Sequence, residues 1–449
     1  MGSEMCIRDR YMNKTILFTP VGGTDPISAT NCYEGAMLHI CRYYKPDKVI
    51  MYMSKEMLEN KKIDNRYEYC LDELSKIQNR HMEYDTIERI DLTNVHEFDF
   101  YYTEFRNIIH EILEKIDDTD TLLINVSSGT PAMKSGLLVL QTMEDFPAKL
   151  IQVSNPEKKI GEHIHKGYDV KTLWELNEDN EPGAENRCKE IKCPSLEKIK
   201  KEEIIKKHIQ AYDYKAALTV VETMNVEDMS EFVELLEVAE KRLMLDFSGI
   251  DKFLKDRDYN FMPVRSSAER MIFEYALNLD IRLKKGEYAD FIRALTPIIV
   301  ELFELILKKQ CKIDINDYCY IDKKGLRKWS QEKLNNTEIL VALNDAFMGN
   351  FKYGDVYSVH IKSLIERFTD NADLKKLVND IREVEEKIRN DAAHDMISVT
   401  DKTVCAKTGY TSAQIMKMIH SAFSYTGINV KKEYWNSYDD MNRLLLSRI

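Results

Sequence analysis

The segment TLLINVSSGTPAMK, residues 121–134, combines an apolar run, a polar turn and the start of a helix. The run Thr121–Val126 predicts a buried strand, because short apolar runs bounded by turn residues are typical of such strands. Thr130 is a good helix N-cap, and Pro131 suits the first helical position, where its missing N–H costs nothing. The segment therefore predicts a helix that begins at the carboxyl end of a strand.

The alternation of strand and helix extends outward from this segment over residues 15–174. Predicted strands are Thr15–Thr19, Lys48–Met53, Thr86–Leu92, Thr121–Val126 and Lys149–Val153. Helical spacing occurs between them in Asn31–Tyr44, Glu56–Gln78, Phe100–Ile116 and Pro131–Glu144. This order predicts an α/β, Rossmann-like domain with a mostly parallel sheet covered on both faces. Ligands of such sheets bind where strand order reverses, so the loops after the first and fourth strands are the candidate site.

The composition changes at residues 177–194, where Glu, Asp, Asn, Pro and Gly occur without apolar periodicity. Such a stretch is typical of a linker, and an all-α region follows it. Predicted helices there begin at Ser195 and continue through Ala216–Met224, Met229–Leu245, Ser266–Lys284, Ala289–Lys308, Ser358–Arg367 and Leu374–Ala393. We expect a non-native leader at 1–12, with Met12 the natural start, a ligand-sensing domain at 13–178, a linker at 179–194, a helical connecting domain at 195–290 and a last domain at 291–449.

The composition describes an ordinary globular chain of 449 residues, with 44% hydrophobic and 31% charged residues. A net charge of −12 argues against coating of nucleic acid, so we expect no stable DNA binding and only local RNA contact. No apolar run of membrane-spanning length and no signal peptide is present, which favours a cytoplasmic protein without membrane contact. The nine cysteines lack the spacing of zinc or disulfide frameworks. Even the close pair Cys188 and Cys193 lacks further ligands, so no metal site is expected.

The loop after the fourth strand suits an anion. The helix that starts at Pro131 presents unpaired amides and the positive end of its dipole, and Lys134 lies one turn inside. A phosphodiester would bind well there, whereas the alternative is a plain capped turn. The candidate ligand-binding residues of this loop are Ser127, Ser128, Gly129, Thr130 and Lys134.

The loop after the first strand, Pro20–Pro26, lets a ligand approach the backbone closely at Gly22 and Gly23. It lacks the third glycine of the dinucleotide fingerprint and the Gly-Lys-Ser/Thr ending of a Walker A loop, which disfavours NAD and ATP. Thr24 and Asp25 complete the candidate set. Asp25 would repel a phosphate, so we expect it either to bind a sugar hydroxyl or adenine amino group, or to stabilise the turn.

The sequence RNDAAH, residues 389–394, lies in the predicted helix Leu374–Ala393. Ile381, Val384, Ile388 and Ala392 form the apolar stripe of this helix, which places Asn390 and His394 away from the core and Arg389 on the flank. The motif could be a polar solvent face. Alternatively, two such helices face each other in a dimer and share one cleft.

These side chains suffice for RNA cleavage without a metal. His394 can act as general acid or base, Arg389 can hold the scissile phosphate and offset its growing charge, and Asn390 can orient a phosphate oxygen or the ribose. Attack by the ribose 2′-OH would leave a 2′,3′-cyclic phosphate and would restrict the substrate to RNA. No HExxH motif or clustered carboxylate pattern supports a metal mechanism.

The two loops and the Arg389, Asn390 and His394 pattern together resemble the CARF–HEPN ribonucleases associated with type III CRISPR systems, close to the stand-alone accessory RNase of the III-A subtype. Domain order and length agree over residues 13–449, although 195–290 matches only as generic helices. The resemblance implies a CARF domain followed by a HEPN domain, in a homodimer that binds cyclic oligoadenylate and then cleaves single-stranded RNA. It implies a ring of four or six adenylates, of which we favour six, and no further cofactor. Some relatives also cleave the activator slowly in the CARF site, and Thr130 is the candidate for such a role here.

Two other functions remain open at this stage. The chain could be a constitutive HEPN ribonuclease of the toxin kind. It could also be a CARF sensor that regulates transcription without nuclease activity, which would need a helix-turn-helix with a basic recognition helix.

Overall fold

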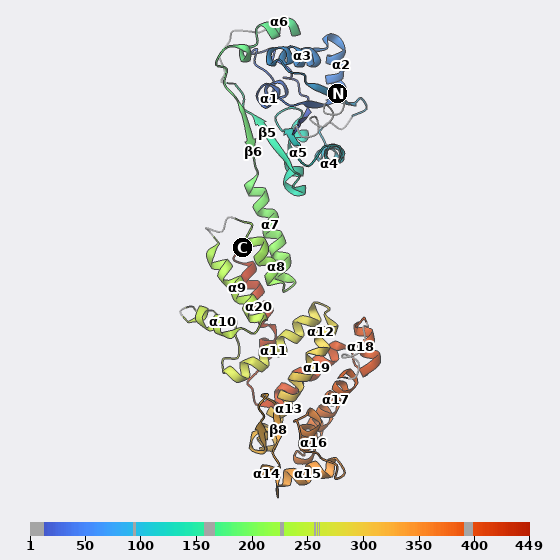
Figure 1. Cartoon of the computed structure of the whole chain (residues 1–449), viewed down its shortest axis with the longest axis vertical. Coiled ribbons are helices and arrows are strands. Elements are labelled where there is room, and N and C mark those ends of the chain that lie inside the picture. Colours follow the sequence, from blue (N-terminus) through green and yellow to red (C-terminus); the bar gives the residue numbers. More distant parts are fainter. Residues whose placement is uncertain are drawn as a thin grey trace, which may run out of the picture. The chain divides into compact units, whose positions relative to one another are not determined.

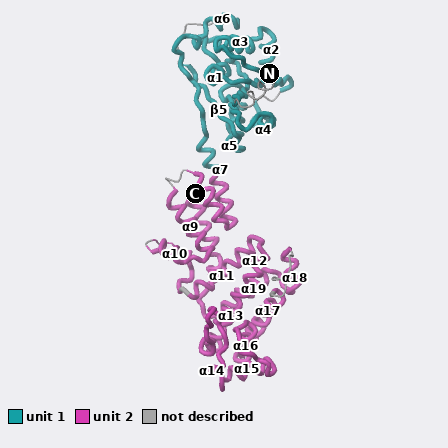
Figure 2. The backbone as a smooth tube through the Cα atoms, in the orientation of Figure 1, with its two compact units in different colours: residues 1–200 teal, residues 201–449 magenta. Residues whose placement is uncertain are grey.

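The computed structural model describes residues 13–92, 96–156, 167–224, 229–255, 257, 259, 261–389 and 398–449. These residues form two compact units, 1–200 and 201–449, shown in different colours in Figure 2. No helix of the described ranges is long and apolar enough to cross a membrane.

The first unit is built on a six-stranded sheet with the order β3-β2-β1-β4-β5-β6. Its first five strands are parallel neighbours, and β6 pairs antiparallel with β5 at the edge. The strands are β1 (Thr15–Pro20), β2 (Lys48–Ser54), β3 (Glu83–Arg89), β4 (Thr121–Asn125), β5 (Ala148–Val153) and β6 (Cys188–Ile191). The predicted α/β class with a mostly parallel sheet is confirmed.

Helices cover both faces of this sheet (Figure 1). They are α1 (Ala36–Tyr44), α2 (Lys55–Asp64), α3 (Arg66–Gln78), α4 (Phe98–Leu113), α5 (Pro131–Glu144) and α6 (Val170–Glu175). Alternation along β1 divides the apolar residues between two cores, because successive side chains of a strand point to opposite faces. Leu17 lies in the core with α1 and α3, whereas Phe18 packs edge-on against Phe105 of α4, with ring centres 5.6 Å apart.

Two predicted helices of this unit differ from the structure. The predicted helix Asn31–Tyr44 begins only at Ala36, because Glu34 forms a β-bridge with Ile27. The predicted helix Glu56–Gln78 is divided into α2 and α3 at Asn65, whose backbone is left-handed with φ of 51°. Asparagine tolerates this conformation better than most residues, so it can end one helix and precede the next.

The expected linker at 179–194 is not a free connection. Residues 188–191 form β6, in which Ile191 pairs with Leu150 and Cys188 pairs with Val153 of β5. Edge strands are short and carry polar residues, so their sequence lacks the apolar run by which a central strand is found. The sheet therefore extends into the segment that the composition suggested as a linker.

The described residues of the second unit are helical or in loops apart from the hairpin of β7 (Cys319–Ile321) and β8 (Arg327–Trp329). The predicted all-α character of this region is confirmed. Helix α7 (Pro194–Gln210) crosses the boundary between the units. The other helices are α8 (Tyr214–Val221), α9 (Ser230–Leu243), α10 (Phe247–Leu254), α11 (Ser267–Lys284), α12 (Tyr288–Arg293), α13 (Leu295–Cys311), α14 (Gln331–Leu334), α15 (Glu338–Ala346), α16 (Ser358–Phe368), α17 (Ala372–Arg389), α18 (Asp401–Thr408), α19 (Ser412–Thr426) and α20 (Ser437–Leu446).

Helix α13 is the centre of the second unit and packs against α16, α17 and α19. Its buried residues, among them Leu302, Phe303 and Ile306, belong to a single apolar core. The predicted helix Ala289–Lys308 is divided into α12 and α13 at Ala294. A buried ion pair between Arg242 of α9 and Glu274 of α11, with Nε to Oε2 at 2.9 Å, joins the helices that precede α13.

Glu304 of α13 gives the second unit a pH-dependent stability. Burial raises the pKa of this carboxyl from 4.5 to about 7, against the opposing effect of Arg327, while Glu301 adds to the rise. Because the folded pKa lies above the unfolded one, stability falls as the pH rises from about 4.5 to 7, by about 3 kcal/mol in total. We expect Glu304→Gln to match the wild type at pH 5 and to be more stable at pH 8, measured by urea unfolding. The exposed Glu332→Gln is the control, and equal pH slopes for wild type and Glu304→Gln would contradict the assignment.

Candidate functional site

The two candidate loops meet at the carboxyl edge of the sheet. Strands β1 and β4 are parallel neighbours, and strand order reverses between them. Asn125 at the end of β4 donates from Nδ2 to Oγ1 of Thr19, 2.9 Å away on β1. A β-carbon on Gly22 would lie 2.8 Å from the backbone nitrogen of Gly129. The loops therefore touch at the switch point of the sheet, where the sequence predicts the ligand site.

The turn between β4 and α5 is held by side chains that bond its backbone. Oδ1 of Asn125 accepts from the amide of Ser127 at 2.8 Å, and Oγ of Ser127 accepts from the amide of Val153 at 2.8 Å. Oγ1 of Thr130 accepts from the amide of Met133 at 3.3 Å, which confirms Thr130 as the N-cap. These bonds preorganise the turn in front of the first amides of α5, where an anion is favoured.

Gly129 has a positive φ of 89°, and a β-carbon there would lie 2.8 Å from Sδ of Met133. The left-handed backbone conformation therefore favours glycine at this position.

Asp25 is buried beneath the first loop, with 2% of its surface exposed. Its Oδ2 accepts from the amide of Gly22 at 2.8 Å, and its Oδ1 accepts from the amide of Met37 in α1 at 3.1 Å. Burial raises the pKa of this carboxyl, although the two amides and the nearby Lys134 act against the rise. Of the two roles expected for Asp25, the structure shows the stabilisation of the turn, and direct ligand contact is disfavoured because the side chain is covered.

The other candidate residues differ in their access to solvent. Gly23 and Thr24 are exposed, Gly22, Ser127, Gly129, Thr130 and Lys134 are half-buried, and Ser128 is buried. The Lys134 ammonium forms no ion pair with another described residue. The hydroxyl of Ser128 is close enough to Asp25 to affect its pKa, but it makes no hydrogen bond of ordinary length within the described ranges. A set of amides and hydroxyls with one nearby ammonium suits an anionic ligand with several phosphates.

The nuclease motif lies at the limit of the described residues. Arg389 is the last residue of α17, and Asn390 and His394 lie outside the described ranges. The preceding part of the helix has the predicted stripe, in which Ile381, Val384 and Ile388 are buried. The three-residue catalytic set therefore stays a prediction from the sequence.

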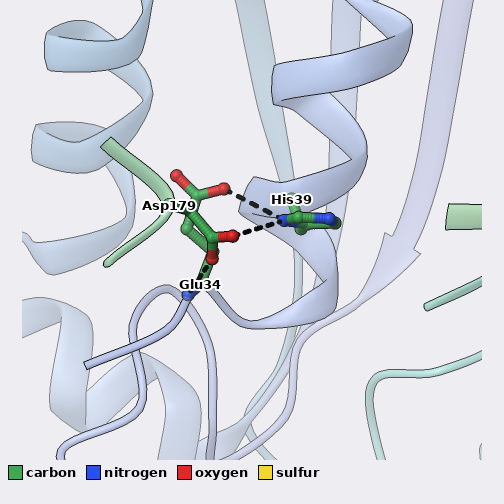
Figure 3. A group of neighbouring side chains, drawn as sticks. All are labelled: Glu34, His39 and Asp179. Carbon is green, nitrogen blue, oxygen red and sulfur yellow. Dashed lines mark hydrogen bonds and ion pairs between the residues drawn. The ribbon is translucent and has the colours of Figure 1, made fainter. Parts of the chain in front are cut away.

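A cluster of charged residues in the first unit was not predicted. Figure 3 shows the carboxylates of Glu34 and Asp179 directed toward the ring of His39, which belongs to α1. The distances from His39 Nδ1 are 3.4 Å to Glu34 and 3.5 Å to Asp179, and all three side chains are buried. Burial acts to lower the pKa of His39, but the hydrogen bonds to Asp179 and Glu34 outweigh it and raise the pKa.

The three side chains are close enough together to hold a metal ion, with ligand atoms within 4.8 Å of one another. Two arginines, however, already neutralise the carboxylates. Arg42 binds Glu34 through Nε at 2.9 Å and Nη2 at 2.5 Å, and Arg187 binds Asp179 through Nη2 at 2.7 Å. The backbone amide of Arg187 also donates to Nε2 of His39 at 3.1 Å. We interpret the cluster as an ion-pair network that fastens residues 177–187 to α1.

Loss of Asp179 would leave Arg187 without its buried carboxylate partner and His39 with Glu34 alone. We expect Asp179→Ala to destabilise the protein by about 3–5 kcal/mol, because an uncompensated buried charge is costly. Urea unfolding of the full chain measures this effect, and the exposed Glu175→Ala serves as the control. A surface substitution changes the free energy of unfolding by about 1 kcal/mol or less. If Asp179→Ala differs from the control by no more than this, the structural role of the network is contradicted.

Comparison with known protein families identifies three matching domain models in the order of the chain. The Csm6 CARF domain matches residues 83–188, the Csm6 6H domain matches 191–243, and the Csm6 HEPN domain matches 261–446. Together they cover more than half of the chain. The sequence prediction of a CARF region followed by a HEPN region is confirmed, and the limits of the domains stay a prediction.

Curated relatives match over nearly their whole length. The chain is 29% identical over 412 residues to the CRISPR system endoribonuclease Csm6 of Mycobacterium tuberculosis, covering 90% of this chain and 93% of that protein. It is 24% identical over 443 residues to the endoribonuclease Csm6′ of Streptococcus thermophilus, covering 97% and 99%. Among solved structures, Enterococcus italicus Csm6 bound to cyclic hexa-2′-fluoro-hexa-dAMP superposes with a TM-score of 0.64 at 20% identity, covering 97% of this chain and 100% of that one.

Proposed function

Because the chain belongs to the CARF–HEPN endoribonucleases associated with type III CRISPR systems, we propose that cyclic oligoadenylate switches on its cleavage of single-stranded RNA. The ligand binds across the CARF domains of a homodimer, and the two HEPN domains share the catalytic cleft. The protein acts in the cytoplasm and needs no metal. One observation carries the regulatory part of this proposal, namely the contact between the Gly22 and Gly129 loops in front of the N-terminus of α5.

The geometry of these loops supports a cyclic oligonucleotide as activator. The amides of α5, the hydroxyls of Thr24 and Ser127 and the ammonium of Lys134 would bind phosphates and ribose. We favour a ring of six adenylates over one of four, and the ring analogue bound by the Enterococcus italicus protein supports this preference. The hydroxyl of Thr130, at the N-cap of α5, would contribute to slow cleavage of the activator, which limits the response.

The chemistry proposed for the HEPN domain uses Arg389, Asn390 and His394. His394 would remove the proton from the ribose 2′-OH or protonate the leaving 5′-oxygen, since an imidazole titrates near neutral pH. Arg389 would stabilise the charge that grows on the phosphate, and Asn390 would orient it. The products are a 2′,3′-cyclic phosphate and a 5′-hydroxyl.

A single assay tests the proposal. Fluorogenic single-stranded RNA is incubated in EDTA with the protein alone, with cyclic tetraadenylate and with cyclic hexaadenylate. We expect cleavage only with a ring, and at lower concentrations of the hexamer. Cleavage independent of either ring would favour a constitutive ribonuclease, and ring binding without any cleavage would favour a sensor that regulates other proteins.

A further inference from the structure

We propose that a cavity in the HEPN domain, beside β8 and the start of α16, binds one nucleotide of the RNA substrate apart from the cleavage site. The cavity has a volume of about 420 Å³, and its walls include Lys328, Phe351, Lys352, Asp355, Tyr357 and His360. This inference rests on the proposed function, because it assigns a binding subsite for the same RNA. Figure 1 shows the elements concerned, β8, α14, α15 and α16, at one end of the second unit.

The walls of the cavity are aromatic. His360 packs edge-on against Phe351 and Phe347, with ring centres 5.5 Å and 5.3 Å apart. Tyr357, which is 42% exposed, lies over His360 with ring centres 5.6 Å apart. A base can stack on such an exposed ring, and stacking of this kind tolerates any base.

His360 supplies a hydrogen-bond donor to the wall of the cavity. Burial lowers its pKa to about 4, so the ring is neutral at physiological pH. Nδ1 accepts from Nε1 of Trp329 at 3.0 Å, which places the single proton on Nε2. His360 is buried, with 9% of its surface exposed, and it forms part of the cavity wall. The neutral ring therefore offers a nucleotide in the cavity an N–H donor beside the stacking surface.

The charges of the cavity also suit a nucleotide. Lys352 is exposed and makes no ion pair with a described residue, so its ammonium is available for a phosphate. Lys328 is shared between Asp322 at 3.1 Å and Asp355 at 3.8 Å. The carboxylate of Asp355, which also accepts from the Tyr357 hydroxyl at 3.3 Å, can accept from a base amino group. The protein is acidic as a whole, but a single lysine beside stacking rings can bind RNA locally.

The cavity lies close to the helix that leads into the catalytic motif. Ser358, next to Tyr357, donates from Oγ to Oε2 of Glu385 on α17 at 2.5 Å. Arg389 follows Glu385 by one turn, a rise of about 6 Å. The residue after Tyr357 therefore contacts α17 one turn before the helix reaches the predicted catalytic motif.

The test compares single variants of the full-length protein in the presence of activator. We expect Tyr357→Ala and Lys352→Glu each to raise KM for single-stranded RNA about tenfold with kcat unchanged, because loss of one stacking or phosphate contact weakens binding by this order. Tyr357→Phe keeps the ring and should retain the wild-type KM. Lys432→Glu makes the same charge change at an exposed lysine of the second unit and should also leave KM unchanged.

Binding is measured separately by fluorescence anisotropy of labelled RNA on His394→Ala, alone and combined with Tyr357→Ala or Lys352→Glu. Weaker RNA binding in both combinations supports the subsite, whether or not the wild type cleaves. Wild-type KM and unchanged anisotropy in both variants would overturn it while leaving the proposed function intact. Absence of RNA cleavage by activated wild type would instead reject the proposed function.

Discussion

Replacement of His394 by alanine is expected to reduce activator-dependent RNA cleavage by a factor of about 10²–10⁴, the usual contribution of a general acid or base. The proposed ligand site lies in the other unit, so binding of cyclic hexaadenylate should be unchanged. Initial rates on fluorogenic RNA and calorimetric titration of the ring measure the two properties on the same preparation.

The control for His394→Ala is Glu386→Ala. Glu386 belongs to α17, and its side chain is 69% exposed, so its loss tests whether any change near the motif lowers activity. Cleavage that survives in His394→Ala would remove the catalytic assignment. A rate that depends on added divalent metal would contradict the mechanism even if His394 proved essential.

The second large effect is expected from Gly22→Ala. A β-carbon at Gly22 would approach the backbone nitrogen of Gly129 to 2.8 Å, and no flexible side chain is available there to move aside. The two loops must then separate, which would disrupt the phosphate-binding surface that both form. We expect the activator concentration for half-maximal cleavage to rise at least about 100-fold, since loss of two charge-assisted hydrogen bonds costs about 3 kcal/mol or more.

Gly23→Ala is the informative comparison for Gly22→Ala. A β-carbon at Gly23 meets nothing within 4 Å, so the contact between the loops survives. A large effect of Gly22→Ala and a smaller one of Gly23→Ala would show that contact between the loops matters more than space for the ligand. Equal activation of the wild type and Gly22→Ala would reject the assigned site.

The meeting of the two candidate loops could be predicted from the sequence because its signals are local. Thr130 and Pro131 specify a helix start through capping chemistry, and an apolar run specifies the strand before it. The parallel order then places the loops of β1 and β4 together. The helical break at Asn65 was missed, since a left-handed residue within a continuous helical pattern gives no apolar signal.

The ion-pair network and the cavity could not be predicted because their partners are far apart in the sequence. Asn177 donates to Glu34 across a separation of 143 residues, and Trp329 donates to His360 from another element. The amino-acid sequence gives no sign that Asp179 is buried whereas Glu175, four residues earlier in α6, is exposed. Only folding brings such groups together, and long-range pairing of charges leaves no periodic pattern.

The edge strand β6 and the residues before it determine where a fragment that contains only the CARF domain can end. A fragment that ends at residue 178, the limit expected from composition, would lack Asp179, Arg187 and the whole of β6. Its β5 edge would be open to pairing with other molecules, and Glu34 and His39 would lose partners. A fragment that extends through Ile191 keeps both the edge strand β6 and the ion-pair network. An isolated sensor domain for ligand titration should therefore include this strand, or it will aggregate before it can be measured.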